Sequence, residues 1–166
     1  MKIQGKAHKF GDDINTDYII SGKYKFKTLD MNELAKHVME DLDPDFYSKI
    51  EAGDFIVAGR NFGCGSSREQ APLAIKHANI GAVLAKSFAR IFFRNAINTG
   101  LPVIECDTDQ IDAGDKLSVD LATGKLVNET KNKDIEIKQL PDVMIKILND
   151  GGLAEHFKKH GGFNIG

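Results

Sequence analysis

Apolar runs and helical patterns alternate along the middle of the chain. Short runs at 55–58, 80–85 and 101–105 are rich in branched residues and predict buried strands. Between them, residues 71–77 and 87–99 carry apolar residues at helical spacing and predict two helices, the second ending at Gly100. Strands that alternate with helices are typical of a parallel sheet with helices packed on it.

The two ends of the chain show other patterns. Residues 2–10 predict a strand, 14–20 a mixed loop and short strand, 30–40 a helix capped by Asp30 or Asn32, and 45–50 a short helical turn. Alternating segments between 114 and 139 predict antiparallel strands, and helices follow near 141–149 and 153–160. We therefore expect one α/β domain over residues 1–166, with a mixed, mostly parallel sheet flanked by helices.

Composition narrows the possible partners. Of the 166 residues, 42% are hydrophobic, which is enough to bury one sizeable core. The formal net charge of -2 gives no general attraction to nucleic acid. No stretch approaches the roughly 20 apolar residues of a membrane span, and the first residues hold no apolar signal segment. We expect a cytoplasmic protein that binds neither nucleic acid nor membrane.

The cysteine content limits the metal chemistry of the chain. Cys64 and Cys106 are the two cysteines, they lie far apart in the sequence, and neither belongs to a zinc-binding pattern. An iron–sulfur cluster usually takes three or four cysteines. We predict no metal ligand in this chain, and if the chain serves such a cluster, another chain must carry it.

A glycine-rich bend follows the strand predicted at 55–58. Gly63 and Gly65 allow a tight turn that can approach a ligand closely. Ser66 or Ser67 can cap the next helix, and Arg68 offers a flat clamp for a carboxylate or phosphate. Because Pro must lie in a helix's first turn, we expect that helix to begin between 67 and 69. The bend therefore predicts an anion-binding site with two hydroxyls in reach.

Other chemistries fit the bend less well. A nucleophile elbow needs glycine two residues after the serine, where this chain has Arg68, and the phosphate-binding loop pattern is absent. An ordinary glycine turn that caps a helix is the simplest alternative. It would leave Cys64, Ser66 and Arg68 without a common task.

Three further groups of polar residues could reach a ligand. Thr16 and Asp17 follow a turn at residues 11–13, and ordinary turn chemistry is their simplest explanation. Ser87 has the position of a helix cap. Arg90 and Arg94 stand four residues apart on one helix face, as solvated surface charges or as a guard around a shared anionic ligand.

Three segments resemble the aconitase swivel domain, from about residue 2 to residue 157. Its free-standing form is the small subunit of 3-isopropylmalate dehydratase and of archaeal-type homoaconitase. The matching motifs are Phe10-Gly11-Asp12-Asp13-Ile14-Asn15-Thr16-Asp17, Gly63-Cys64-Gly65-Ser66-Ser67-Arg68-Glu69 and the run from Ala85 to Asn95 with Gly100-Leu101-Pro102.

This resemblance implies a hydro-lyase that isomerises a hydroxy-di- or tricarboxylic acid by dehydration and rehydration. It implies that a large subunit carries a [4Fe-4S] cluster and that this chain closes over it. Ser66 matches the base that takes a proton from carbon, while Ser67 and Arg68 match residues that bind substrate carboxylate. Asp17, with Thr16 beside it, matches an aspartate that supports acid–base residues of the other subunit.

The segment that would select the substrate departs from the family pattern. It comprises Tyr24, Lys25, Phe26, Lys27 and Thr28, where relatives carry leucine followed by an apolar residue or an arginine. Phe26 facing the substrate would suit an alkyl group, whereas Lys25 or Lys27 would suit a carboxylate. Because arginine is absent, we expect an alkyl-substituted malate such as 3-isopropylmalate or dimethylmalate. Homoaconitase chemistry and a non-catalytic anion-binding module stay open as alternatives.

Overall fold

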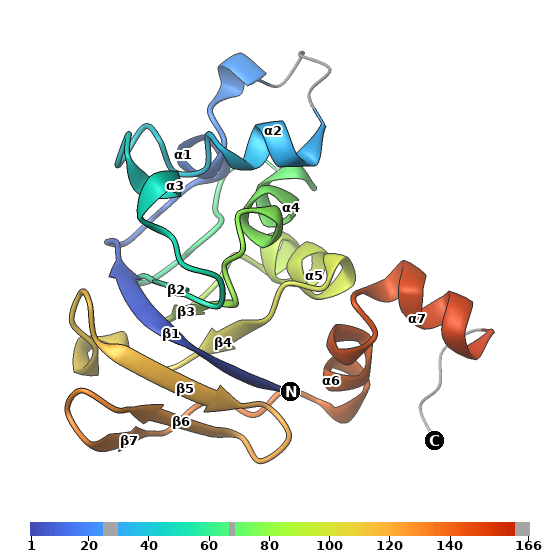
Figure 1. The fold of residues 1–166 in the computed structure, drawn as a ribbon. Coiled ribbons are helices and arrows are strands. Elements are labelled where there is room, and N and C mark those ends of the chain that lie inside the picture. The colour runs from blue at the N-terminus through green and yellow to red at the C-terminus, as the bar shows by residue number, and fades with distance from the viewer. Residues whose placement is uncertain (25–29, 67–68, 162–166) are drawn as a thin grey trace.

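The computed structural model describes residues 1–24, 30–66 and 69–161. They form a seven-stranded sheet in the order β4-β3-β2-β1-β5-β6-β7 (Figure 1). The strands are β1 (Lys2–Lys9), β2 (Phe55–Val57), β3 (Ala82–Ala85), β4 (Val103–Glu105), β5 (Lys116–Asp120), β6 (Lys125–Asn128) and β7 (Lys133–Ile135). The helices are α1 (Thr16–Ile19), α2 (Met31–Ala35), α3 (Phe46–Lys49), α4 (Gln70–His77), α5 (Arg90–Thr99), α6 (Asp142–Asn149) and α7 (Leu153–His160).

The sheet has a parallel and an antiparallel half. Strands β1 to β4 pair in parallel, and every residue of β2 and β3 is buried, as expected for strands covered on both faces. Strands β5 to β7 pair antiparallel, and β5 and β6 alternate between buried and more exposed residues. The mixed sheet predicted from the sequence, with its antiparallel extension between 114 and 139, is confirmed.

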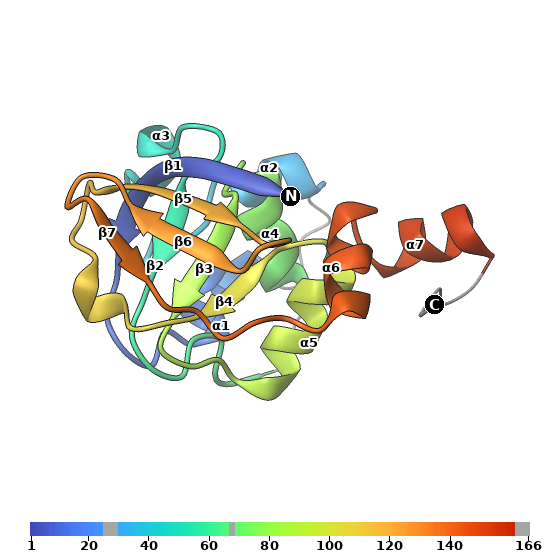
Figure 2. The same cartoon turned by 90° about the horizontal axis from the view of Figure 1, so that it is seen from below.

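Strand β1 joins the two halves. Its residues 2–6 pair antiparallel with β5, whereas its residues 7–9 pair in parallel with β2. Beyond the two edge strands, Cys106 and Ile137 form one further antiparallel bridge. The segment after β7 therefore runs beside the end of β4 before it reaches α6 (Figure 2).

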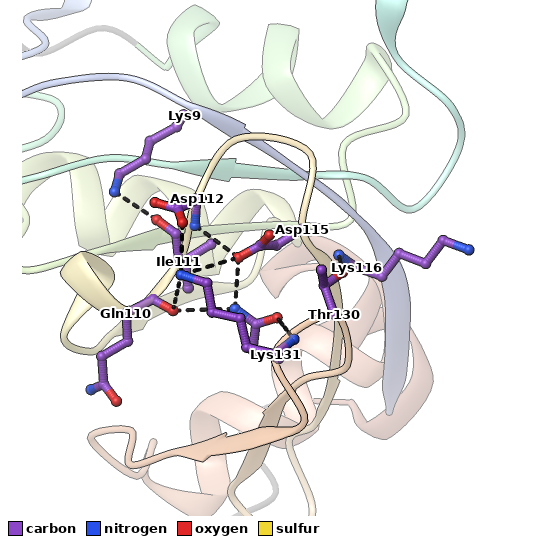
Figure 3. Close-up of polar contacts among 9 residues, drawn as sticks. Lys9, Gln110, Ile111, Asp112, Asp115, Lys116, Thr130 and Lys131 are labelled. Carbon is purple, nitrogen blue, oxygen red and sulfur yellow. Dashed lines mark hydrogen bonds and ion pairs between the residues drawn. The ribbon is translucent and has the colours of Figure 1, made fainter.

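A polar network fixes the connection between the two halves (Figure 3). Asn128 is fully buried, and its side-chain amide donates to Asp115 Oδ2 at 2.8 Å and to the Gln110 carbonyl at 3.1 Å. Hydrogen bonds from the Asp112 N–H and from Asn128 hold the pKa of Asp115 below its ordinary value. Lys9, at the end of β1, donates to the Ile111 carbonyl at 2.6 Å. The loop before β5 is thus tied to both β1 and β6.

Three local predictions were wrong. Residues 16–19 form the helical turn α1 instead of a strand, because Asn15 Oδ1 accepts from the N–H groups of Asp17 and Tyr18. The helix after Asp30 ends at Ala35, although Asp30 does cap it. Helix α5 begins at Arg90, since Ser87 Oγ accepts from the Asn61 N–H at 2.8 Å instead of capping the helix.

Helices α4 and α5 lie side by side, and α6 and α7 pack against α5 at the far end of the molecule from α3 (Figure 1). Across the residues that the structure describes, no helix is both long and apolar enough to cross a membrane.

Candidate active site

The glycine bend lies between β2 and α4 and has the backbone that glycine favours. Gly63 has a φ of 83° and Gly65 a φ of 91°, both in the left-handed region. A Cβ on Gly63 would overlap the ring of Phe92 on α5. The bend therefore packs directly against α5, and any side chain at position 63 would push the two apart.

Backbone and side-chain hydrogen bonds fasten the bend to the start of α1. The Gly63 N–H donates to the Ile14 carbonyl at 2.7 Å, and the Thr16 N–H donates to the Cys64 carbonyl at 2.9 Å. Thr16 Oγ1 donates to the Ser66 carbonyl at 2.8 Å, and Thr16 is only 2% exposed. Two segments 50 residues apart in the sequence thus form one unit.

The predicted catalytic residues lie at the open side of this unit. Ser66 is exposed and follows the bend, while Asp17 is exposed in the first turn of α1, next to Thr16. The structure therefore brings Thr16, Asp17 and Ser66 together. Their catalytic and binding roles stay predictions.

Ser66 does not cap the following helix. Helix α4 begins at Gln70, and Glu69 before it makes no side-chain cap bond. The Ser66 carbonyl is instead taken by Thr16, which holds the chain in the bend. The predicted substrate-binding residues Ser67 and Arg68 lie outside the described residues, and so do Lys25, Phe26, Lys27 and Thr28 of the specificity segment.

Tyr24 stands at the base of the specificity segment and is tied to the chain beyond α2. Its hydroxyl donates to Glu40 Oε1 at 2.8 Å and lies 3.0 Å from His37 Nδ1, and its ring stacks on His37. Burial acts to raise the pKa of Glu40, but hydrogen bonds from His37 and Tyr24 outweigh it and leave this pKa below its ordinary value. The Glu40 carboxylate therefore holds Tyr24, the first residue of the specificity segment, in place.

A cavity of about 310 Å³ opens beside the bend. Thr16, Gly63 and Gly65 form one wall, and α5 forms the other through Arg90, Ile91 and Asn95, with Ala89 and Phe92. Neither Arg90 nor Asn95 is among the catalytic and substrate-binding residues predicted from the sequence. The spacing of Arg90 and Arg94 left two alternatives open, solvated surface charges or residues around a shared anionic ligand. Arg90 lines the cavity.

The chain offers too few ligands for an iron–sulfur cluster. It has two cysteines, of which Cys64 lies half-buried in the bend and Cys106 beyond β4 in the bridge to Ile137. Within the described residues, Asp150, His156 and His160 have ligand atoms within 4.8 Å of one another. They lie just after α6 and in α7, however, and both histidines hydrogen-bond to Asp150.

A comparison with protein families shows the family to which this chain belongs. A model described as the aconitase C-terminal domain matches residues 12–109. The chain belongs to this family. The match spans α1, the bend and α5, so the elements that form the candidate site all lie within the matched residues. Strands β5 to β7 and helices α6 and α7 follow after them.

Named relatives cover nearly the whole chain. The 3-isopropylmalate dehydratase small subunit 2 of Archaeoglobus fulgidus is 62% identical over 165 residues, which is 99% of this chain and 100% of that protein. The methanogen homoaconitase small subunit of Methanothermobacter thermautotrophicus is 54% identical and covers 95% of this chain and 91% of its own. A crystal structure of 3-isopropylmalate dehydratase from Methanocaldococcus jannaschii superposes with a TM-score of 0.92 at 52% identity, covering 97% of this chain and 96% of that chain. The predicted aconitase swivel-type fold is confirmed.

Proposed function

We propose that this chain is a single-domain small subunit of a cytoplasmic two-subunit hydro-lyase. The enzyme would isomerise an alkyl-substituted malate of the 3-isopropylmalate type by dehydration and rehydration. The observation that carries the proposal is the fastened bend. It joins Ser66 to Thr16, the neighbour of Asp17, and Thr16 lines a cavity together with Arg90. The names of the closely similar small subunits support the substrate class.

Ser66 is the residue that we assign to proton transfer. Its alkoxide takes the proton from the carbon next to a substrate carboxylate. The electrons of that C–H bond form a double bond to the neighbouring carbon, whose hydroxyl takes a proton from an acid of the large subunit and leaves as water. Rehydration reverses these steps with the proton and hydroxyl exchanged between the carbons. Ser67 and Arg68 hold a carboxylate, and Asp17 with Thr16 supports acid–base residues of the large subunit.

The exposure of Ser66 explains why a second subunit is needed. A serine hydroxyl has a pKa far too high to act as a base at neutral pH unless cations and N–H groups surround its alkoxide in a closed site. Ser66 and Asp17 are both exposed in this chain. The large subunit therefore has to cover them, and we assign the [4Fe-4S] cluster to that subunit, because this chain has two cysteines.

The test is anaerobic co-expression with the large-subunit gene and assay of the purified complex. We expect turnover of 3-isopropylmalate or dimethylmalate. Turnover of citrate and homocitrate alone would instead show a homoaconitase, which the 54% identity to the methanogen small subunit keeps as the second candidate. Binding of malate-like acids by the isolated chain, with no turnover by the complex, would favour an anion-binding module and overturn the proposal.

Replacement of the proposed base tests the mechanism separately. Ser66→Ala should abolish turnover and leave subunit assembly and the cluster spectrum unchanged, since only an exposed hydroxyl is lost. Ser118→Ala on β5, in the antiparallel half, is the matched control and should keep full activity. Retained activity in Ser66→Ala would contradict the assignment.

A further inference from the structure

Asp150, His156 and His160 bring three metal-ligating side chains together beside the turn between α6 and α7 (Figure 1). Asp150 ends α6, and Gly151 and Gly152 separate it from α7. The two histidines stand four residues apart, which places them on one face of α7. The three side chains do not line the cavity beside the glycine bend, so this cluster is separate from the candidate active site.

Both histidines point at the same carboxylate oxygen. His156 Nδ1 lies 2.8 Å and His160 Nε2 lies 3.0 Å from Asp150 Oδ2. In a tetrahedral zinc site with ligands about 2.0–2.1 Å from the ion, neighbouring ligand atoms are about 3.3 Å apart. Small side-chain shifts would open the two observed distances to that value. The hydrogen-bonded cluster is therefore close to the geometry of a three-ligand zinc site.

Burial and a further contact hold the ligands in place. The side chain of His156 is fully buried, that of Asp150 is 8% exposed and that of His160 is 29% exposed. Asp150 Oδ1 accepts a hydrogen bond from Lys159 Nζ at 3.2 Å, which leaves Oδ2 to the two histidines. Carboxylate ligands of metal ions are commonly oriented by such a second contact.

The types of ligand select the kind of ion. Two imidazole nitrogens and one carboxylate oxygen suit Zn²⁺, whereas Mg²⁺ and Ca²⁺ prefer oxygen ligands. The charge of Lys159 opposes a cation at this place. Its side chain is 67% exposed, however, and can turn into solvent when the carboxylate binds an ion.

We propose that Asp150, His156 and His160 bind a zinc ion, which clamps α7 to the end of α6. This inference goes beyond the hydro-lyase function and does not depend on it. It departs from the expectation that the chain holds no metal ligand, because that expectation rested on the cysteines and this site uses none. An ion that binds the folded helices and not the unfolded chain stabilises the folded state by mass action.

The experiment measures zinc binding by the full chain, purified without a histidine tag and stripped of metal with a chelator. Isothermal titration should show a single zinc ion bound per chain. Zinc at about a hundredfold above its Kd should raise the melting temperature by about 5–10 °C. The same concentration of Mg²⁺ should leave the melting temperature unchanged, because Mg²⁺ prefers oxygen ligands and retains its waters.

His160→Gln and His77→Gln form a matched pair of variants. Loss of a residue that only orients a ligand lowers metal affinity about ten- to hundredfold, so loss of a ligand in His160→Gln should raise the Kd at least about tenfold. His77 is exposed at the end of α4 and lies outside the cluster, so His77→Gln should bind zinc as the wild type does. Asp150→Asn removes the carboxylate charge with little change of shape. It should raise the Kd as well, and it replaces His160→Gln if that variant does not fold.

Three results would overturn the inference. An unchanged Kd in His160→Gln and Asp150→Asn would show that zinc binds elsewhere, and an equal loss in His77→Gln would show adventitious ions on surface histidines only. Zinc that binds without raising the melting temperature would show that it does not clamp the helices. These measurements need neither the large subunit nor turnover, so their failure would leave the proposed function untouched.

Discussion

Thr16 is the residue through which the loop before α1 controls the position of Ser66. Its buried hydroxyl donates to the Ser66 carbonyl, not to the Ser66 side chain. The backbone that carries the proposed catalytic hydroxyl is thus held by a buried side chain. Thr16 is a positioning residue in this arrangement, in addition to any contact that it makes with substrate.

Thr16→Val should therefore lower both stability and turnover. The variant keeps the shape of the side chain but leaves a carbonyl without its donor, which should cost about 1–2 kcal/mol in the free energy of unfolding. A small shift of Ser66 should lower kcat on the order of tenfold or more. Chemical denaturation and steady-state kinetics of the reconstituted enzyme measure the two effects.

Thr108→Val provides the comparison. Thr108 is also 2% exposed, and its Oγ1 donates to the Ala58 carbonyl at 2.7 Å. The same chemical change at this site should lower stability by a similar amount and leave kcat unaltered. Equal losses of kcat in both variants would show that Thr16 acts through global stability and not through Ser66.

Among the elements, α6 and α7 are joined by a charged cluster around Asp150. His156 Nδ1 and His160 Nε2 lie 2.8 Å and 3.0 Å from Asp150 Oδ2, and Lys159 Nζ lies 3.2 Å from Oδ1. The hydrogen bond from His156, which is fully buried, is the main reason that the pKa of Asp150 falls to about 2, and Lys159 and His160 add to it against the effect of burial. The cluster links the end of α6 to three residues of α7.

This depressed pKa makes the α6–α7 contact sensitive to acid. A carboxylate whose pKa is lower in the folded state contributes stability above its unfolded pKa of 3.8, and the contribution is lost as the pH falls toward 2. The difference in unfolding free energy between the wild type and Asp150→Asn should therefore shrink between about pH 5 and pH 2.5. Urea denaturation at each pH measures it.

Asp134→Asn is the control for acid sensitivity, because Asp134 is an exposed residue of β7. It should differ from the wild type by the same small amount at each pH. A wild-type advantage over Asp150→Asn that stays constant down to the lowest pH would contradict the prediction.

The periodicity of apolar residues predicted the elements that are long or fully apolar. It failed where contacts with distant parts of the chain determine the local structure. The runs that became β2, β3 and β4 carry their own signal, because each is buried throughout or nearly so. Helix α1 has four residues, too few for a helical period, and its buried Ile19 made it resemble a strand. Ser66 and Ser87 suit helix caps, but their partners Thr16 and Asn61 lie far away in the sequence.

One part of the candidate site was likewise predictable from the sequence, and another part was not. The bend was predictable because glycine and serine in that order have few other uses next to a strand. The cavity was not predictable, since it forms where α5 packs on Gly63 and where Thr16 lies beside Gly65. Sequence spacing cannot show which of the two arginines, Arg90 or Arg94, lines it. Arg90 is distinguished from Arg94 by tertiary structure alone.

For the whole molecule, the two halves of the sheet should differ in local stability. Strand β3 is buried throughout and is flanked by β2 and β4. Strand β7 pairs with β6 alone, and Lys133 and Asp134 are exposed. Hydrogen exchange should therefore be slowest in β3 and fast in β7, because amides at an exposed edge open without global unfolding.

Strand β4 tests whether edge position alone sets the rate. It is the other edge strand and has the same length as β7, but it is mostly buried and Lys138 N–H donates to its Glu105 carbonyl at 3.0 Å. Its amides should exchange more slowly than those of β7. Similar protection in β7 and β3, measured by mass spectrometry of peptic fragments, would contradict the prediction.

The bridge between Cys106 and Ile137 also bears on self-association. It lets the segment after β7 cover the end of β4, where another chain could otherwise add a strand. Strand β7, at the other edge of the sheet, carries an exposed lysine and an exposed aspartate, Lys133 and Asp134. Charges on an edge strand discourage edge-to-edge pairing between molecules. Both edges of the sheet thus carry features that disfavour pairing with another copy, while Gly65 and Ser66 in the glycine bend remain exposed.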